Sequence, residues 1–331
     1  MAGIVVRAAP PGGEPGHLGL DFASSADRSL ISGLQITHDF SCGASYKLGL
    51  MINPRSKVDV RPSISPIPGG PLAVVTEDVS EALRLAPVWL HAGWIDVIWR
   101  FRRTRLGPFW HTLGIAAFII TMGVIWSTIL HQDPGQYFRF VGTGIIVWGL
   151  IASFITDGTS IIIAGQSTAL SMRFPYVAFA FAHVWKSLLL FGHHFVLYIL
   201  IMVGTLHSPG WTVLLAIPGL ILAIANGVWM SLLSGMLCLR RRDLGPAIAS
   251  GMQIMMFVTP VFWPKDMLGP NLGIAADLNP FYHMVRIVRD PLLGIVPDPV
   301  SWFWVLGTLV VGLLVTFWSY GLYRDRMAYW Y

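Results

Sequence analysis

The sequence predicts an all-α integral membrane protein with six transmembrane helices. Apolar residues make up 54% of the 331 residues and charged residues only 12%, whereas soluble proteins contain about 25% charged residues. The charges gather in clusters and leave uncharged runs, several of which approach the roughly 20 residues that a helix needs to cross a membrane core. This combination excludes an ordinary soluble globular protein. Two cysteines, Cys42 and Cys238, also exclude a disulfide scaffold and any multi-cysteine metal centre.

The N-terminal segment 1–75 differs from the rest of the chain. It is rich in proline, glycine and serine, as in PPGGEPG and SPIPGGP, and has no sustained periodicity, which is typical of disorder. Charged residues interrupt the first 30 positions, so we do not expect a cleaved signal peptide. We expect 1–75 to be a disordered extension. Alternatively, the extension is mis-assigned and Met51 is the true start of the protein. Residues 76–331 should form the transmembrane domain.

An amphipathic helix is expected over residues 80–105, before the first span. Tryptophan and arginine crowd its second half, and the two residue types together suit a helix that lies in the lipid headgroup region. The relevant residues are Trp94, Trp99, Arg100, Arg102 and Arg103. Alternatively, this segment simply extends the first span, but Gly93 and the break at Leu106-Gly107-Pro108 favour a separate element.

The six spans are expected within residues 108–323. Unpaired backbone amides are not tolerated in lipid, so long apolar runs are read as helices. The runs are Leu113–Leu130, Phe140–Thr156, Ser187–Leu206, Trp211–Leu239, Leu244–Pro264 and Val300–Tyr323.

The distribution of basic residues predicts the orientation of these spans. Ten lie in segments on one side, namely Arg100, Arg102, Arg103, Arg105, Arg173, Arg240, Arg241, Arg242, Arg324 and Arg326. The other side has Arg139, Lys265, Arg286 and Arg289. The positive-inside rule therefore places both termini in the cytoplasm. The net charge of +5 needs no nucleic-acid partner, because these residues lie where membrane topology requires them.

The link between the fifth and sixth spans, Lys265 to Pro299, is long and half apolar. Asn279-Pro280 can start a helix, and apolar residues then recur at helical spacing up to Leu292. A free outer loop would not need such apolarity. We expect one or two short re-entrant helices here.

The sequence lacks the motifs of several enzyme classes. It contains no phosphate-binding loop, no nucleophile elbow and no H-E-x-x-H zinc motif. His183, His193 and His194 could belong to a membrane metal enzyme, but we expect them to be hydrogen-bond partners between helices, and no metal site. No carboxylate lies at mid-depth of a span, which disfavours an ion-coupled carrier. Any transport energy should therefore come from a partner.

Four segments together resemble the permease subunits of type-2 ABC exporters, in particular the branch that exports polysaccharides and polyol phosphates such as O-antigen, capsule and teichoic acid. They are WRFRRTRLGPFWHTLG (99–114), MRFPY (172–176), RRRDLGP (240–246) and NPFYHMVRIVRDPLLG (279–294). The resemblance covers residues 79–331 in order and spacing. The long N-terminal extension departs from the pattern of that family.

The resemblance implies a homodimer whose two copies form a channel, with two ATP-binding subunits on the cytoplasmic face. ATP and Mg²⁺ would bind those subunits, so this chain would carry no cofactor and would not be an enzyme. The residues expected to couple to the ATPase are Gln166, Ser167, Arg173, Phe174, Pro175, Arg240, Arg241, Arg242 and Asp243. Residues near an outer gate would be Asn279, Pro280, Phe281, Tyr282, Arg286 and Arg289.

Aromatic residues are the candidates for lining the channel. Aromatic faces can stack on sugar rings, although they also pack helices together in membrane cores. From helix depth we expect Trp126, Tyr137, Phe138, Trp148, Phe257 and Phe262 to contact the substrate.

The function that follows is ATP-driven export of a lipid-linked polysaccharide across the bacterial inner membrane. Membrane lipids and the glycan would be the further partners. The alternatives are an ABC exporter of a drug or lipid, an ion-coupled carrier, and a membrane-integral enzyme.

Overall fold

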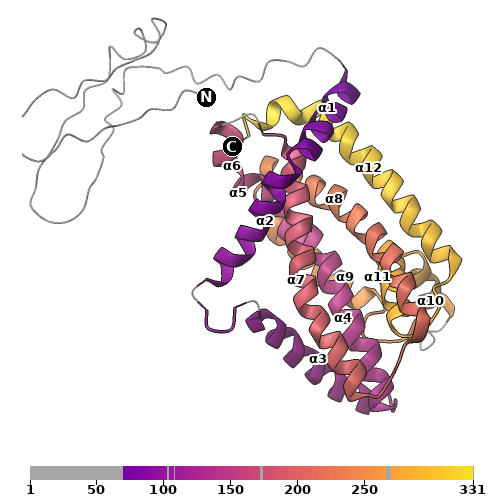
Figure 1. Ribbon diagram of the computed structural model, residues 1–331. Coiled ribbons are helices and arrows are strands. Elements are labelled where there is room, and N and C mark those ends of the chain that lie inside the picture. The colour runs from indigo at the N-terminus through magenta and orange to yellow at the C-terminus, as the bar shows by residue number, and fades with distance from the viewer. Residues whose placement is uncertain (1–69, 103, 108, 172–173, 266–269, 331) are drawn as a thin grey trace, which may run out of the picture. The chain divides into compact units, whose positions relative to one another are not determined.

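The computed structural model describes residues 70–102, 104–107, 109–171, 174–265 and 270–330. All regular structure in these residues is helical (Figure 1). The α-helices are α1 (Pro71–Arg84), α2 (Ala86–Phe101), α3 (Phe109–Ile129), α4 (Pro134–Thr156), α5 (Ile161–Ala164), α6 (Gln166–Ser171), α7 (Tyr176–Gly204), α8 (Ala216–Arg240), α9 (Leu244–Val258), α10 (Pro270–Asp277), α11 (Pro280–Leu292) and α12 (Pro299–Met327). Two 3₁₀ helices, η2 (Asp157–Ser160) and η3 (Gly210–Leu215), extend α4 and precede α8.

Five helical segments in the described residues are long and apolar enough to cross a membrane. They contain α3, α4, α7, α8 and α12, so the prediction of a multi-pass helical protein is confirmed. The predicted fifth span, Leu244–Pro264, contains only the 15-residue helix α9. At 1.5 Å per residue, α9 is about 22 Å long, shorter than a hydrocarbon core of about 30 Å. The count of six spans therefore stays a prediction.

Proline explains where α9 ends. Thr259, the residue after the helix, is extended with ψ 135°, because a following proline disfavours the helical conformation. Proline also divides the predicted interface helix. The structure has two helices, α1 and α2, in place of one over residues 80–105, and Pro87 lies in the first turn of α2. Helix α1 begins at Pro71, inside the predicted extension, while residues 1–69 lie outside the described part of the chain.

Three helices begin with an Asp or Asn followed by proline. The side chains of Asp133, Asn279 and Asp298 accept hydrogen bonds from backbone N–H groups in the first turns of α4, α11 and α12. Each satisfies one of the free amides at a helix start, and the proline loses nothing there because its missing N–H would be unpaired. The Asp133 cap explains why α4 starts at Pro134, six residues before the predicted span.

Helix α4 lies at the centre of the main apolar cluster, packed against α3, α7, α8 and α11. A second cluster joins α1, the start of α7 and the C-terminal ends of α8 and α12. We call the end of the bundle that carries Arg240–Arg242, Arg324 and Arg326 the basic end. Helices α10 and α11 lie beside the N-terminal half of α12, at the opposite end (Figure 1).

Candidate functional site

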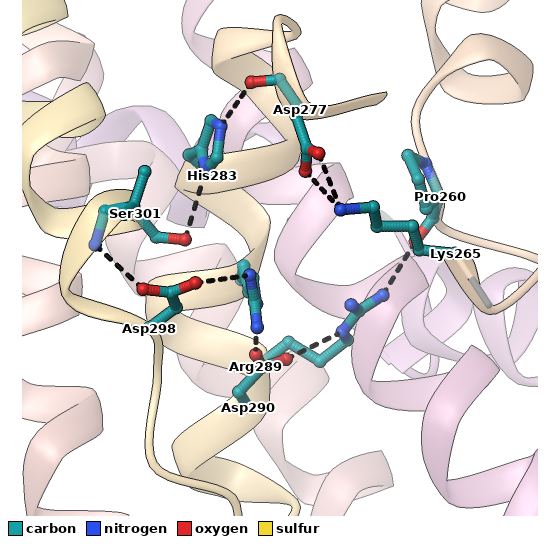
Figure 2. Close-up of polar contacts among 10 residues, drawn as sticks. Pro260, Lys265, Asp277, His283, Arg289, Asp290, Asp298 and Ser301 are labelled. Carbon is teal, nitrogen blue, oxygen red and sulfur yellow. Dashed lines mark hydrogen bonds and ion pairs between the residues drawn. The ribbon is translucent and has the colours of Figure 1, made fainter. Parts of the chain in front are cut away.

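The first candidate site is the turn that ends α9, residues 259–262, which we call the α9 turn. Side chains from two other helices hold its polar atoms. Arg289 Nη1 of α11 donates to the Pro260 carbonyl at 2.8 Å, as Figure 2 shows. The Tyr137 hydroxyl of α4 donates to the Phe262 carbonyl. Asn279 Nδ2 donates to Thr259 Oγ1 at 2.9 Å. The end of the short helix is thus fastened to α4 and α11.

Arg289 is the charged residue of this contact, and only 4% of it is exposed. Its guanidinium lies 4.3 Å from the centre of the Phe140 ring, and its Nε lies 3.5 Å from Asp290 Oδ1. Burying such a cation costs several kcal/mol unless partners compensate. Arg289 Nε has no hydrogen bond among the described residues. A buried ionisable group next to apolar spans is a candidate functional residue by this cost alone.

The turn also packs closely on α4. A Cβ atom built on Gly144 would lie 3.1 Å from the Val261 carbonyl oxygen, which is tighter than ordinary contact. Glycine at this position therefore lets the backbone of the turn approach the helix.

Polar contacts continue from Arg289 along α11 to the start of α12 (Figure 2). Arg286 Nε donates to Asp290 Oδ2 at 2.9 Å, and Arg286 Nη1 lies 3.7 Å from Asp298 Oδ2. On the other side of α11, Lys265 Nζ donates to Asp277 Oδ2 at 2.7 Å and thereby joins the segment after the α9 turn to α10. This last pair is partly exposed, so it contributes at most about 1 kcal/mol.

His283 connects α10, α11 and α12 within the same region. Its Nε2 is 2.7 Å from the Asp277 carbonyl, which can only accept, so Nε2 carries the proton. Its Nδ1 is 3.0 Å from Ser301 Oγ, and the ring stacks on Trp304 at 5.4 Å. Burial lowers the pKa of His283 and favours the neutral ring. Burial likewise raises the pKa of Tyr282.

The structure brings most of the predicted outer-gate residues together. Asn279 caps α11, Pro280 is its first residue, and Arg286 and Arg289 carry the contacts described above. Phe281 packs edge-on against Trp148 of α4. Tyr137 was expected in a channel, and its hydrogen bond to the α9 turn was not foreseen.

The second candidate site is the predicted coupling segment at the basic end. Gln166 begins α6, Ser167 is exposed, and Pro175 precedes α7. Phe174 packs against Phe179 of α7 at 5.0 Å. Arg173 lies outside the described residues.

The segment between α8 and α9 lies at the same end. Arg240, Arg241, Arg242 and Asp243 are all exposed. The Arg240 guanidinium lies over the rings of Tyr323 and Trp330, at 5.7 and 5.6 Å. The role of both segments in coupling stays a prediction.

On α2 the expected interface residues are exposed. Trp94 is 51% exposed and Trp99 is 63% exposed. The Arg102 guanidinium lies 5.0 Å from the Trp99 ring, and Arg100 is exposed. Arg103 lies outside the described residues.

The six predicted channel aromatics differ in burial. Tyr137, Trp148 and Phe262 are buried within the single chain, whereas Trp126 and Phe138 are partly buried. Phe257 of α9 is 58% exposed. A channel between two copies needs exposed side chains, so Phe257 is the best placed of the six, and the assignment stays a prediction.

The histidines make hydrogen bonds to neighbouring groups. His111 Nδ1 of α3 is 2.9 Å from His194 Nε2 of α7. His193 bonds the Leu189 carbonyl of its own helix, and His183 bonds the Ser153 carbonyl of α4. In the described part of the chain, no three His, Cys, Asp or Glu side chains are grouped as a metal site would require.

Sequence reasoning missed a buried ion pair between α1 and α12, the first and last helices of the described chain. Asp78 of α1 is fully buried and accepts hydrogen bonds from Arg324 Nε at 3.0 Å and Nη2 at 3.1 Å. The Tyr320 hydroxyl donates to the same carboxylate. No local pattern could have found residues more than 240 positions apart in the chain.

Comparison with known proteins decides the family. Residues 90–293, more than half of the chain, match the family described as ABC-2 type transporter. The chain belongs to the ABC-2 type transporter family. This ABC-2 transporter chain is 25% and 23% identical, over 202 residues, to two proteins of Klebsiella pneumoniae that are each named O-antigen export system permease protein RfbA. Each alignment covers 59% of this chain and 76% of the relative.

The matched region of this ABC-2 transporter chain contains both candidate sites. It begins within α2 and ends just after α11, so it includes the coupling segment and the α9 turn. Helices α1 and α12, which carry the Asp78–Arg324 pair, lie outside it.

Proposed function

We propose that this chain is the permease subunit of an ATP-driven exporter that moves a lipid-linked polysaccharide across the bacterial inner membrane. The observation that carries the proposal is the similarity, over 202 residues, to two permeases of O-antigen export systems. The apolar helices that could span a membrane agree with a role in forming the passage itself.

An ATP-binding partner subunit would supply the energy and bind ATP and Mg²⁺. The chain has no phosphate-binding loop of its own. The exposed segment around Gln166 and Ser167 would contact the partner, together with Arg240–Asp243. Phe174 packs on α7. A displacement of this segment by the ATP-binding subunit would therefore move α7, which would span the membrane.

A second copy of the chain would complete the passage. In the single chain only Met252 of α9 is buried, although Ile254, Phe257 and Val258 are large and apolar. A short apolar helix with so little cover suits an interface with a second copy. Phe257 would then face the sugar polymer, which aromatic faces can bind weakly and repeatedly.

The α9 turn would act as the outer gate. Its polar atoms are satisfied by Arg289, Tyr137 and Asn279 in the arrangement described above. Opening would require α9 to leave α4 and α11 and would expose the buried guanidinium. By the positive-inside rule, the basic end and both termini would lie in the cytoplasm.

Depletion of the chain in its native cell tests this function. We expect surface polysaccharide to fall while lipid-linked glycan accumulates where a membrane-impermeant label cannot reach it. Re-expression of the wild-type chain should reverse both effects. Unchanged surface glycan, with loss of export of a drug or a phospholipid, would contradict the proposal and favour another substrate of the same transporter class.

A further inference from the structure

A cavity of about 360 Å³ lies between α2, η2, α5 and the first half of α7. This volume is in the range of small-molecule sites, about 300–1,000 Å³. It is distinct from the α9 turn. Its ionisable and hydroxyl side chains are Asp96 and Arg100 from α2, Asp157 and Ser160 from η2, and His183 and Lys186 from α7.

The cavity lies where the spans change from charged to uncharged. The 17 residues before Asp157, Phe140–Thr156, carry no charge, and neither do the residues that follow Lys186 as far as Gly204. Exposed tryptophans on α2, at positions 94 and 99, are typical of a membrane–water boundary. The cavity is therefore at the level of lipid headgroups.

The charges in the cavity are balanced and incompletely paired. Lys186 Nζ lies 3.7 Å from Asp96 Oδ2, which is too long for a hydrogen bond. Within the described residues, the side chains of Arg100 and Asp157 have no hydrogen bond or ion pair. A cation and an anion on separate walls, neither of them in an ion pair, suit a ligand that carries both signs.

We propose that this cavity binds the headgroup of phosphatidylethanolamine. The phosphate would lie between Arg100 and Lys186, and the ammonium would donate to Asp157. A headgroup with only negative charge would meet two carboxylates, Asp96 and Asp157, and be disfavoured. The trimethylammonium of phosphatidylcholine has no N–H to donate, so it would bind more weakly.

Native mass spectrometry of the full chain tests the proposal. The protein is equilibrated with equal amounts of phosphatidylethanolamine, phosphatidylglycerol and phosphatidylcholine, and the retained lipids are counted. We expect phosphatidylethanolamine to exceed phosphatidylcholine by about tenfold, equivalent to about 1.4 kcal/mol. Retention in proportion to the mixture would overturn the proposal.

Two variants identify the residues. Asp157→Asn should bring the retention of phosphatidylethanolamine close to that of phosphatidylcholine, because the ammonium loses its acceptor. Arg100→Gln should reduce retention of all three phosphate headgroups. The matched controls are Asp243→Asn and Arg105→Gln, exposed residues outside the cavity, which should keep the wild-type ratio. An unchanged ratio of phosphatidylethanolamine to phosphatidylcholine in Asp157→Asn would also overturn the assignment. Asp157 is exposed, so its substitution should leave the fold intact.

A soluble probe separates a lipid from a free metabolite. Phosphatidylethanolamine should raise the unfolding temperature of the delipidated chain, whereas O-phosphoethanolamine should not, because it lacks the acyl chains that partition beside α2 and α7. Equal stabilisation by both would contradict a lipid site.

Discussion

Replacement of Arg289 by methionine tests whether this side chain keeps the α9 turn closed. Methionine has a similar length but no charge. The lost contact is the 2.8 Å hydrogen bond to the Pro260 carbonyl, and a bond from a charged donor contributes about 1.5–3 kcal/mol. This range is a net value, because it already includes the hydration that the guanidinium regains when the turn opens. The opening free energy should fall by about 2 kcal/mol, a population change of about 30-fold.

Hydrogen exchange of peptides that cover residues 255–264 measures this opening. We expect exchange there to be about 30-fold faster in Arg289→Met, with no change in α8. Arg286→Met is the matched control, because its guanidinium contacts Asp290 and Asp298 but has no hydrogen bond or ion pair to the turn. Equal exchange of these peptides in the two variants would refute the reasoning.

Three further predictions concern packing, the buried ion pair and coupling. Gly144→Ala should lower the free energy of unfolding, measured by thermal unfolding, by about 1–3 kcal/mol, because the new Cβ meets the backbone of the α9 turn. Gly149→Ala on the same helix has open space around it and should raise that free energy by up to about 1 kcal/mol. Equal effects of the two variants would contradict the packing argument. Asp78→Asn should cost about 3–5 kcal/mol and expose α1 to protease, because it removes the buried carboxylate that pairs with the Arg324 guanidinium. The control is Asp325→Asn, which removes the exposed carboxylate that contacts the same guanidinium, and it should stay within about 1 kcal/mol. Phe174→Ala should lower transport while ATP hydrolysis by the complex continues; unchanged export would remove this residue from the coupling segment.

The long spans could be predicted from the sequence because a single property, an uninterrupted apolar run, determines them. The predicted first, second, third, fourth and sixth spans correspond to α3, α4, α7, α8 and α12. Boundaries were less predictable, since helices continue beyond the apolar run when a cap or a tertiary contact supports them. Tyr176 starts α7 eleven residues before the predicted span because that extension is buried in the cluster at the basic end. Helix α9 is shorter than predicted because Pro260 ends it.

Part of the candidate site could be predicted as well. The resemblance to type-2 ABC exporters predicts Asn279 and Arg289 near an outer gate. Their partners could not be predicted, because the Pro260 and Phe262 carbonyls are backbone atoms that no residue pattern identifies. The same holds for Asp78, whose partner Arg324 is distant in the chain and close only after folding.

ATP-dependent translocation in proteoliposomes tests the central claim most directly. The chain is purified in mild detergent with the ATP-binding subunit that accompanies it and is reconstituted with lipid-linked polysaccharide from the same cell. We predict that ATP makes the glycan accessible to an impermeant label on the far side, and that a non-hydrolysable ATP analogue does not. Purification of the chain without any ATP-binding subunit, or glycan movement that is independent of ATP, would contradict the account.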